Sequence, residues 1–224
     1  MKFYPTITSI TGKWREKIKE ANEMEIKEVC FFPTMLSLRE RKEAYELLLS
    51  SNIKRIPFVH IRNDMELEEI EFLIKNFGTE RFNIHSHDEF PLIKDYRKYK
   101  DLIYVENVYK GLDEEEVKKW AGICLDFSHL ENDRILDNEK FEENFKVLKR
   151  NKIGCNHISA VCDTFYINQD GFERYDNHMG SELKNFDYVL KYPKEFFSDF
   201  CAMELENDLA FQLEAINYIN ERQN

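Results

Sequence analysis

The sequence predicts a single-domain α/β barrel of the (β/α)8, or TIM-barrel, class. Short β-branched or aromatic runs alternate with amphipathic stretches along the whole chain, which is typical of strand-helix units around a parallel sheet. Histidines and carboxylates recur at the ends of these runs. The chain has 224 residues, of which 42% are hydrophobic, and α/β barrels often have this length as one domain.

Eight strand-helix units follow one another. The strands are expected at residues 3–10, 26–32, 55–61, 81–85, 102–106, 123–127, 153–158 and 197–204. Apolar residues at helical spacing predict helices that pack against the barrel at 67–77, 141–148 and 209–219. Two units are less regular. Residues 91–99 predict only a short helix, and residues 161–181 predict a long irregular loop before a helix at 183–190.

Polar residues and glycine mark several helix ends. Asp64 and Asp113 are expected to cap helices with acidic first turns, and Gly78 is expected to end a helix. Asn207 is expected to cap the last helix. This places Glu204, rather than Glu206, at the end of the eighth strand.

Charge and composition argue against two classes of protein, those that bind nucleic acid nonspecifically and those that associate with membranes. The net charge of -11 argues against broad nonspecific binding to nucleic acid or acidic lipid, because such binding needs a basic face. No stretch approaches the roughly 20 apolar residues of a membrane span, and the first residues lack the long apolar core typical of a signal peptide. The five cysteines form no CxxC pair and are expected to be reduced, mostly as core thiols. We therefore expect a soluble cytoplasmic protein that does not associate with membranes.

Four strand-end residues form the centre of the predicted site. In a barrel of this class the active site lies at the carboxyl ends of the strands, so residues that close different strands converge. Glu106, Asp126, His157 and Glu204 close the fifth to eighth strands and would satisfy one divalent cation. Carboxylates combined with imidazole favour zinc, manganese or a similar ion over calcium, whose ligands are oxygens.

Further candidate ligands bring the total above the number that one ion binds. Asp126 and His129 span a strand end and the following turn, so they can serve adjacent ions. In an Asp-x-His motif in a strand or turn, as at Asp176 and His178, both side chains point the same way. The remaining histidines at expected strand ends are His60 and His85, whereas His87 is expected to be exposed or to support a ligand.

These motifs resemble the successive metal motifs of the xylose isomerase-like barrel superfamily, and in particular its branch of zinc-dependent apurinic-site endonucleases. The resemblance covers about residues 55–207 and rests on Asn83-Ile84-His85, Val105-Glu106-Asn107, Cys124-Leu125-Asp126-Phe127-Ser128-His129, Asn156-His157, Asp176-Asn177-His178-Met179-Gly180 and Met203-Glu204. In that family the matching ligands hold three zinc ions that bind a phosphodiester, activate water and stabilise the leaving oxygen, so we expect two or three zinc ions in this protein. The implied ligands are His60, His85, Glu106, Asp126, His129, His157, Asp176, His178 and Glu204.

The leading hypothesis is a metal-dependent phosphoester hydrolase. The loops after the strands look short, and Arg62, Lys110 and Arg174 look like isolated candidates for binding an anionic group. No cluster of arginine with aromatic residues is apparent that would clamp a bent duplex. A small phosphorylated or sugar-like substrate is therefore favoured over nucleic acid.

Two alternatives stay open. The same superfamily contains sugar and sugar-phosphate isomerases and epimerases, in which one manganese or magnesium ion would hold the substrate while Glu106 and Glu204 act as the catalytic residues that exchange a proton. The second alternative is a barrel that binds a small molecule without turnover. The number of bound ions distinguishes the hydrolase from the isomerase or epimerase. The sequence carries no signal of substrate identity or oligomeric state.

Overall fold

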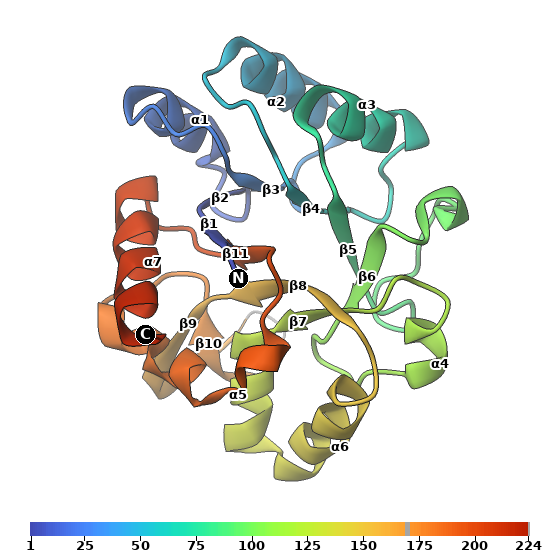
Figure 1. Cartoon of the computed structure of the whole chain (residues 1–224), viewed down its shortest axis with the longest axis vertical. Helices are drawn as coiled ribbons and strands as arrows, with labels where there is room; N and C mark the ends of the chain where they lie inside the picture. The colour runs from blue at the N-terminus through green and yellow to red at the C-terminus, as the bar shows by residue number, and fades with distance from the viewer. Residues whose placement is uncertain (169–170, 224) are drawn as a thin grey trace.

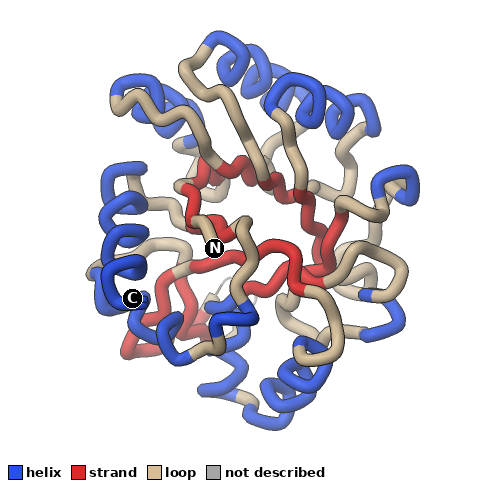
Figure 2. The backbone as a smooth tube through the Cα atoms, in the orientation of Figure 1, coloured by secondary structure: helices blue, strands red, loops and turns tan. Residues whose placement is uncertain are grey.

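A barrel of parallel strands occupies the centre of the computed structural model, which describes residues 1–168 and 171–223. Helices surround this ring of strands (Figure 1, Figure 2). The strand order is β1 (Phe3–Tyr4), β11 (Cys201–Met203), β8 (Ile153–Ile158), β7 (Ile123–Asp126), β6 (Ile103–Glu106), β5 (Arg81–His85), β4 (Phe58–His60), β3 (Cys30–Phe32) and β2 (Thr6–Thr8). The predicted α/β barrel and all eight of its strands are confirmed, although several strands are shorter than expected.

Pro5 divides the first predicted strand into β1 and β2. Proline has no N–H for a sheet ladder, which interrupts regular pairing at this position. On one side of Pro5, β1 pairs with β11, and on the other side β2 pairs with β3. This short segment therefore joins the first and last strands of the sheet and closes the barrel.

The helices form the outer layer of the molecule (Figure 1). The α-helices are α1 (Trp14–Glu23), α2 (Leu38–Ser50), α3 (Leu67–Phe77), α4 (Glu114–Val117), α5 (Phe127–Leu136), α6 (Asn138–Leu148) and α7 (Leu209–Gln223). The 3-10 helices are η1 (Arg97–Tyr99), η2 (Leu183–Lys191) and η3 (Lys194–Phe196). The three predicted apolar stripes correspond to α3, α6 and α7. The helix expected at residues 91–99 is reduced to η1, and the one expected at residues 183–190 is a 3-10 helix.

Two of the predicted helix ends are confirmed. Asp113 caps α4, where its side chain accepts a hydrogen bond from Glu115 N at 2.9 Å. Gly78 ends α3 in the left-handed conformation, with a φ of 64°. That conformation strains any residue with a Cβ, which explains glycine at this position.

The other two predicted caps were wrong. Helix α3 begins after Glu66, which forms a reciprocal capping box with Glu69, whereas Asp64 forms an ion pair with Arg41. At the last helix, Asp208 accepts from Phe211 N at 2.8 Å. Asn207 instead makes two hydrogen bonds to the backbone of Gly180. In each case a tertiary partner holds the side chain that local spacing marked as a cap.

The long loop predicted at residues 161–181 was also wrong for residues 161–168 and 171–181; residues 169 and 170 lie outside the described part of the chain. Most of this segment is an antiparallel hairpin of β9 (Ala160–Ile167) and β10 (Glu173–Asn177). Tyr175 N donates to Asn132 Oδ1 of α5 at 2.8 Å, which fastens the hairpin beside the barrel. Figure 1 shows the hairpin near α5 and α7. It follows β8 in the position where a regular unit would place a helix.

Alternation along the strands separates two apolar clusters. Side chains of one parity form a buried cluster inside the barrel, namely Tyr4, Cys30, Phe32, Phe58, Tyr104, Cys124, Cys155 and Ala202. Neighbours of opposite parity, such as Phe31 and Val105, belong to the larger cluster between the strands and the helices. His60 and Glu106 share the parity of Phe58 and Tyr104. They therefore continue the inner face at the carboxyl end of the barrel.

Gly154 gives a first test of this packing. A Cβ at this position would overlap the ring of Tyr104, which is fully buried. We expect Gly154→Ala to lower the free energy of unfolding by about 1–3 kcal/mol, because overpacking a barrel interior forces the ring or the backbone to shift. Urea unfolding measures this change. Gly111→Ala is the control, since a Cβ there meets only Asn144 Oδ1, at an ordinary 3.6 Å, and should leave the unfolding midpoint almost unchanged.

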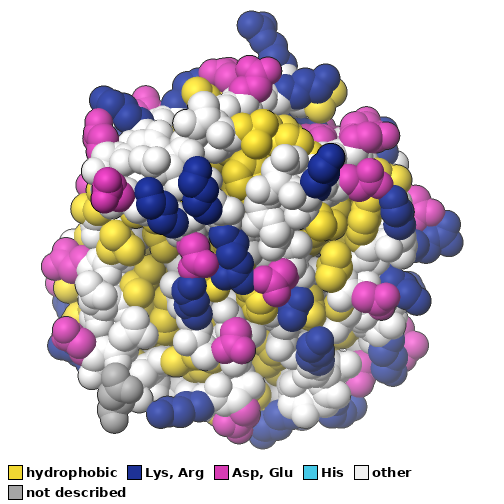
Figure 3. All heavy atoms as spheres, turned by 45° about the horizontal axis from the view of Figure 1, so that its top comes forward, with side chains coloured by type: hydrophobic (Ala, Val, Ile, Leu, Met, Phe, Trp, Pro, Cys, Tyr) yellow, Lys and Arg dark blue, Asp and Glu magenta, His cyan; other side chains and the backbone are white. Residues whose placement is uncertain are grey.

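Most of the cysteines are core thiols, as the sequence predicted. Four cysteines are buried, Cys162 is partly exposed, and all five are free thiols. No helix within residues 1–168 and 171–223 is long and apolar enough to cross a bilayer. On the face shown in Figure 3, basic and acidic side chains are interspersed.

Candidate metal centre

Six of the predicted ligands lie together at the carboxyl ends of the barrel strands. Within the described part of the chain, three groups of side chains offer ligand atoms that all lie within 4.8 Å of one another. The groups are His60, His85 and Glu106; Glu106, Asp126, His157 and Glu204; and Glu106, Cys124 and His157. The four-residue centre predicted from strand ends is therefore assembled, and two further histidines lie next to it.

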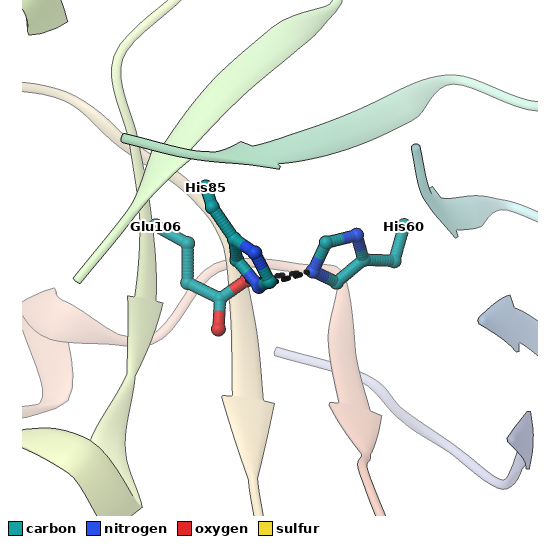
Figure 4. Close-up of side chains that lie close together, drawn as sticks. All are labelled: His60, His85 and Glu106. Atoms are coloured by element: carbon teal, nitrogen blue, oxygen red, sulfur yellow. Dashed lines mark hydrogen bonds and ion pairs between the residues drawn. The ribbon is translucent and has the colours of Figure 1, made fainter. Parts of the chain in front are cut away.

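Glu106 stands between the first two groups. Its Oε2 lies 3.1 Å from His60 Nε2 and 3.8 Å from His85 Nε2, as Figure 4 illustrates. Its Oε1 lies 3.4 Å from His157 Nδ1, in the other group. Asn83, two residues before His85 on β5, donates to Glu106 Oε2 at 2.5 Å and orients the carboxylate. One carboxylate is thus shared by two potential ion sites.

The two histidines of the first group are oriented as ligands. His60 Nδ1 lies 3.1 Å from the carbonyl oxygen of Ile61, and a carbonyl accepts only, so this nitrogen carries the proton and Nε2 keeps its lone pair. His60 Nε2 points at His85 Nε2 across 3.0 Å. Burial, together with the neighbouring His60, lowers the pKa of His85 to about 4. His85 is therefore neutral near pH 7, as a metal ligand must be.

The turn after β7 prepares Asp126 for the second group. Asp126 is the last residue of β7 and also caps α5, so its Oδ1 accepts from His129 N at 2.8 Å and from Ser128 Oγ at 2.6 Å. Its Oδ2 is buried and has no hydrogen-bond partner. Local helix capping thus holds one oxygen and leaves the other directed into the site.

Unpartnered polar atoms of three residues converge at this point. Besides Asp126 Oδ2, both ring nitrogens of His157 and Glu204 Oε2 are buried without a hydrogen-bond partner. His157 Nδ1 and Glu204 Oε2 are 3.1 Å apart, but without the geometry of a hydrogen bond. Buried polar atoms without partners are uncommon and need an explanation, such as an ion. The donor set fits a divalent cation in this respect.

Charge reinforces this fit. Burial alone would raise the pKa of Glu204, but the adjacent His157 outweighs burial and lowers it to about 2. Burial opposes charging of His157, yet Glu106 and Glu204 raise its pKa well above the usual value, so an ion bound there would take the place of a ring proton. Three carboxylates facing one imidazole leave an excess of negative charge. Cys124, in the third group, is a poor ligand because burial raises the pKa of its thiol well above the ordinary value.

The remaining predicted ligands do not form a group of this kind. His129, Asp176 and His178 belong to none of the three groups. His129 Nδ1 contacts Asp176 Oδ2 at 2.9 Å, whereas His178 Nε2 lies 3.7 Å from Glu204 Oε2. Burial disfavours a charged His129, but Asp126 and Asp176 outweigh burial and raise its pKa to about 9. His87 is exposed, as expected.

The three basic residues named as candidates for binding an anionic group all have partners within the protein. Arg62 forms an ion pair with Asp64 at 2.9 Å, and Lys110 Nζ donates to the carbonyl of Asp88 at 3.2 Å. Arg174 is buried and contacts Asp176 and His129. The available signal was the alternation Arg174-x-Asp176, which puts both side chains on one face of a strand once the segment is recognised as a strand.

Sequence reasoning included Asn83 in a motif but gave it no role, although its spacing two residues before His85 places both on the inner face of β5. The choice between two glutamates at the end of β11 is resolved by their contacts. Glu204 lies in the four-residue group, whereas Glu206 accepts hydrogen bonds from the backbone of Ile10 and Thr11.

No protein-family model and no curated protein sequence matches this chain. Among solved structures, the chain is similar to the probable 3-DHS dehydratase AsbF from Bacillus anthracis, with 13% identity, a TM-score of 0.52, and coverage of 98% of this chain and 99% of that one. It also matches thiamine phosphate pyrophosphorylase from Pyrococcus furiosus, with 13% identity, a TM-score of 0.49, and coverage of 100% and 97%. At this identity only the fold is shown. The likeness to AsbF over nearly the whole of both chains agrees with the α/β barrel fold of this chain.

Proposed function

We propose that this protein is a metal-dependent enzyme that hydrolyses a phosphoester at a centre of more than one divalent ion, with zinc as the expected metal. The observation that carries the proposal is the position of Glu106, whose two oxygens face two different groups of ligands. Carboxylates can bridge adjacent ions, and paired ions are typical of enzymes that cleave phosphoesters.

The residues divide into two sets that share Glu106. His60 and His85 would hold one ion with Glu106, and Asp126, His157 and Glu204 would hold another with the same carboxylate. Ions bound there would lower the pKa of a bound water and neutralise charge on the phosphoryl group. The chain itself orients the ligands through Asn83, Ile61 O and Ser128.

Aromatic rings shield the inner side of the site. The ring of His157 lies 4.6 Å from that of Phe32 and 5.3 Å from that of Phe58, measured between centroids. Both phenylalanines are buried in the barrel interior. Exclusion of water from this side strengthens electrostatic interactions at the centre.

A small phosphorylated or sugar-like substrate agrees best with the charges. The net charge is -11, and Arg62, Lys110 and Arg174 all have partners within the protein. A duplex-binding surface would need cations directed at the phosphate backbone. These observations support a small substrate over nucleic acid.

His85→Ala tests the proposal. We expect it to remove about one ion per chain, because it takes away one of the three ligands of the first group, and to reduce phosphoester hydrolysis by roughly 1,000-fold, the equivalent of several kcal/mol of transition-state stabilisation. Elemental analysis and phosphate release from generic mono- and diesters measure the two effects. His87→Ala, at an exposed position two residues away, should alter neither. Full hydrolysis by His85→Ala would contradict the proposal.

A second candidate is a sugar or sugar-phosphate isomerase or epimerase with one manganese or magnesium ion. In its favour, Glu106, Asp126, His157 and Glu204 form a four-ligand group that does not require His60 or His85. Glu106 and Glu204 would then exchange a proton beside the substrate carbonyl. Solvent-proton exchange into a sugar, unaffected by His85→Ala, would replace the hydrolase proposal with this one.

A further inference from the structure

A buried cluster lies beside the candidate metal centre, and we call Arg174, Asp176 and His129 the Arg174 cluster. Arg174 Nε donates to Asp176 Oδ1 at 2.7 Å, and Arg174 Nη2 donates to Asp176 Oδ2 at 2.7 Å. The same Nη2 lies 2.7 Å from His129 Nδ1. Two of the nine ligands that the sequence resemblance implies, Asp176 and His129, therefore contact a guanidinium.

The state of the ligand atoms distinguishes this cluster from the candidate centre. Both oxygens of Asp176 accept hydrogen bonds, and His129 Nδ1 contacts both Arg174 and Asp176. In contrast, Asp126 and Glu204 each present a buried oxygen without a partner. An ion can therefore bind Asp126 and Glu204 without breaking any hydrogen bond of those two oxygens. To bind Asp176, it would first have to displace the bidentate guanidinium of Arg174.

The fold holds Arg174 firmly in this position. Arg174 and Asp176 are two residues apart on β10 and share one face of it, while Tyr175 N between them is bonded to Asn132 of α5. The side chain of Arg174 is only 7% exposed, and its guanidinium lies 5.1 Å from the ring centroid of Tyr109. A guanidinium stays protonated at all physiological pH values. The positive charge at this place is therefore permanent.

Another implied ligand outside the two groups, His178, is turned elsewhere. His178 is 31% exposed at its side chain, and its Nε2 is 3.7 Å from Glu204 Oε2, on the side of the four-residue group. Within the described residues, no group of potential ligands contains His129, Asp176 or His178. The residues present therefore do not fit a third ion.

We propose that the guanidinium of Arg174 takes the place of a third ion, so that the centre holds two ions and the Arg174 cluster positions His129. This inference rests on the proposed multi-ion centre and specifies its composition. In this arrangement Arg174 fixes the carboxylate of Asp176, whose Oδ2 lies 2.9 Å from His129 Nδ1. Nε2 of the same ring is directed toward the centre, 3.7 Å from Asp126 Oδ2 and 3.9 Å from Glu106 Oε1. A fixed organic cation thus replaces an exchangeable metal.

Ion counting tests the inference on the full chain purified without chelator and equilibrated with zinc. We expect about two zinc ions per chain, one for each of the two groups that share Glu106, and the same count in Asp176→Asn and His178→Ala. His60→Ala should lose one ion. A wild-type count of three that falls to two in His178→Ala overturns this inference alone. A wild-type protein without any ion overturns the proposed function, and this inference with it.

The positioning of His129 has its own readout, which does not depend on activity. The ring nitrogens of His129 in 15N-labelled, zinc-loaded protein give signals that report which nitrogen carries a proton. In Arg174→Gln we expect these signals to shift while the count of about two ions is kept, because the neutral amide cannot reproduce the bidentate contact. Unchanged His129 signals in a folded Arg174→Gln variant overturn the positioning role.

Discussion

Glu106→Ala should abolish activity and weaken both ion sites at once. Glu106 is the one residue present in every group of potential ligands found in residues 1–168 and 171–223. Its removal takes a carboxylate from His60 and His85 on one side and from Asp126, His157 and Glu204 on the other. We expect turnover to fall by at least roughly 1,000-fold, because each ion contributes several kcal/mol of charge stabilisation.

In Glu106→Ala, the melting temperature should no longer depend on bound zinc. A ligand that binds only the folded state stabilises it, so zinc should raise the melting temperature of the wild-type protein and EDTA should reverse the effect. Glu106→Ala should show little change with either reagent. Glu206→Gln is the matched control, because Glu206 is buried at the end of the same barrel but bonds to the backbone of Ile10 and Thr11. A zinc response of normal size in Glu106→Ala would contradict the shared role of this carboxylate.

The largest loss of stability is expected from Arg41→Met. Arg41 is completely buried and forms a bidentate pair with Glu69, through Nε to Oε2 at 2.8 Å and Nη2 to Oε1 at 3.0 Å. Tyr45 also donates to Glu69, at 2.8 Å, but cannot replace the charge of Arg41. Because Arg41→Met leaves a buried carboxylate without its cation, we expect the free energy of unfolding to fall by about 3–5 kcal/mol.

Two further variants separate the lost pairing from the lost side-chain volume. Arg41→Met combined with Glu69→Leu should recover much of the stability, because buried ion pairs often tolerate apolar replacement of both partners. Arg39→Ala, at an exposed position on the same helix, should change stability by no more than about 0.5 kcal/mol. Denaturant unfolding of all three variants gives the comparison. Equal losses in the single and double variants would show that packing, not charge, dominates.

The pH dependence of the Arg41–Glu69 pair follows from the direction of the shift. Burial alone would raise the pKa of Glu69, but hydrogen bonds from Arg41, Glu66 N and Tyr45 outweigh burial and lower it below the ordinary 4.5. A carboxyl with a lowered folded-state pKa contributes its stability above its ordinary pKa. This contribution is lost as the pH falls from about 4.5 through the folded pKa. Arg41→Met should remove that acid-side dependence.

The strands and the centre of the site could be predicted from the sequence because both depend on local patterns. Apolar runs predicted β5 and β8 with the observed bounds. For β3 and β11 the runs were longer than the strands, because apolar character reports burial and not membership of a hydrogen-bonded ladder. Parallel strands place their carboxyl ends at one edge, so Glu106, Asp126, His157 and Glu204 could be grouped without knowing any contact.

The remainder depended on contacts between segments distant in the sequence. Asp64 had the spacing of a cap, but Arg41 recruits it across 23 residues. The β9–β10 hairpin carries exposed Phe165, Tyr166 and Ile167, so burial alternation, the usual signal of a strand, is weak there. The sequence by itself determined the barrel and which residues close its strands. Only the tertiary structure decided that Arg174 pairs with Asp176 and His129, because an ion pair forms between charges that the whole fold brings together and buries.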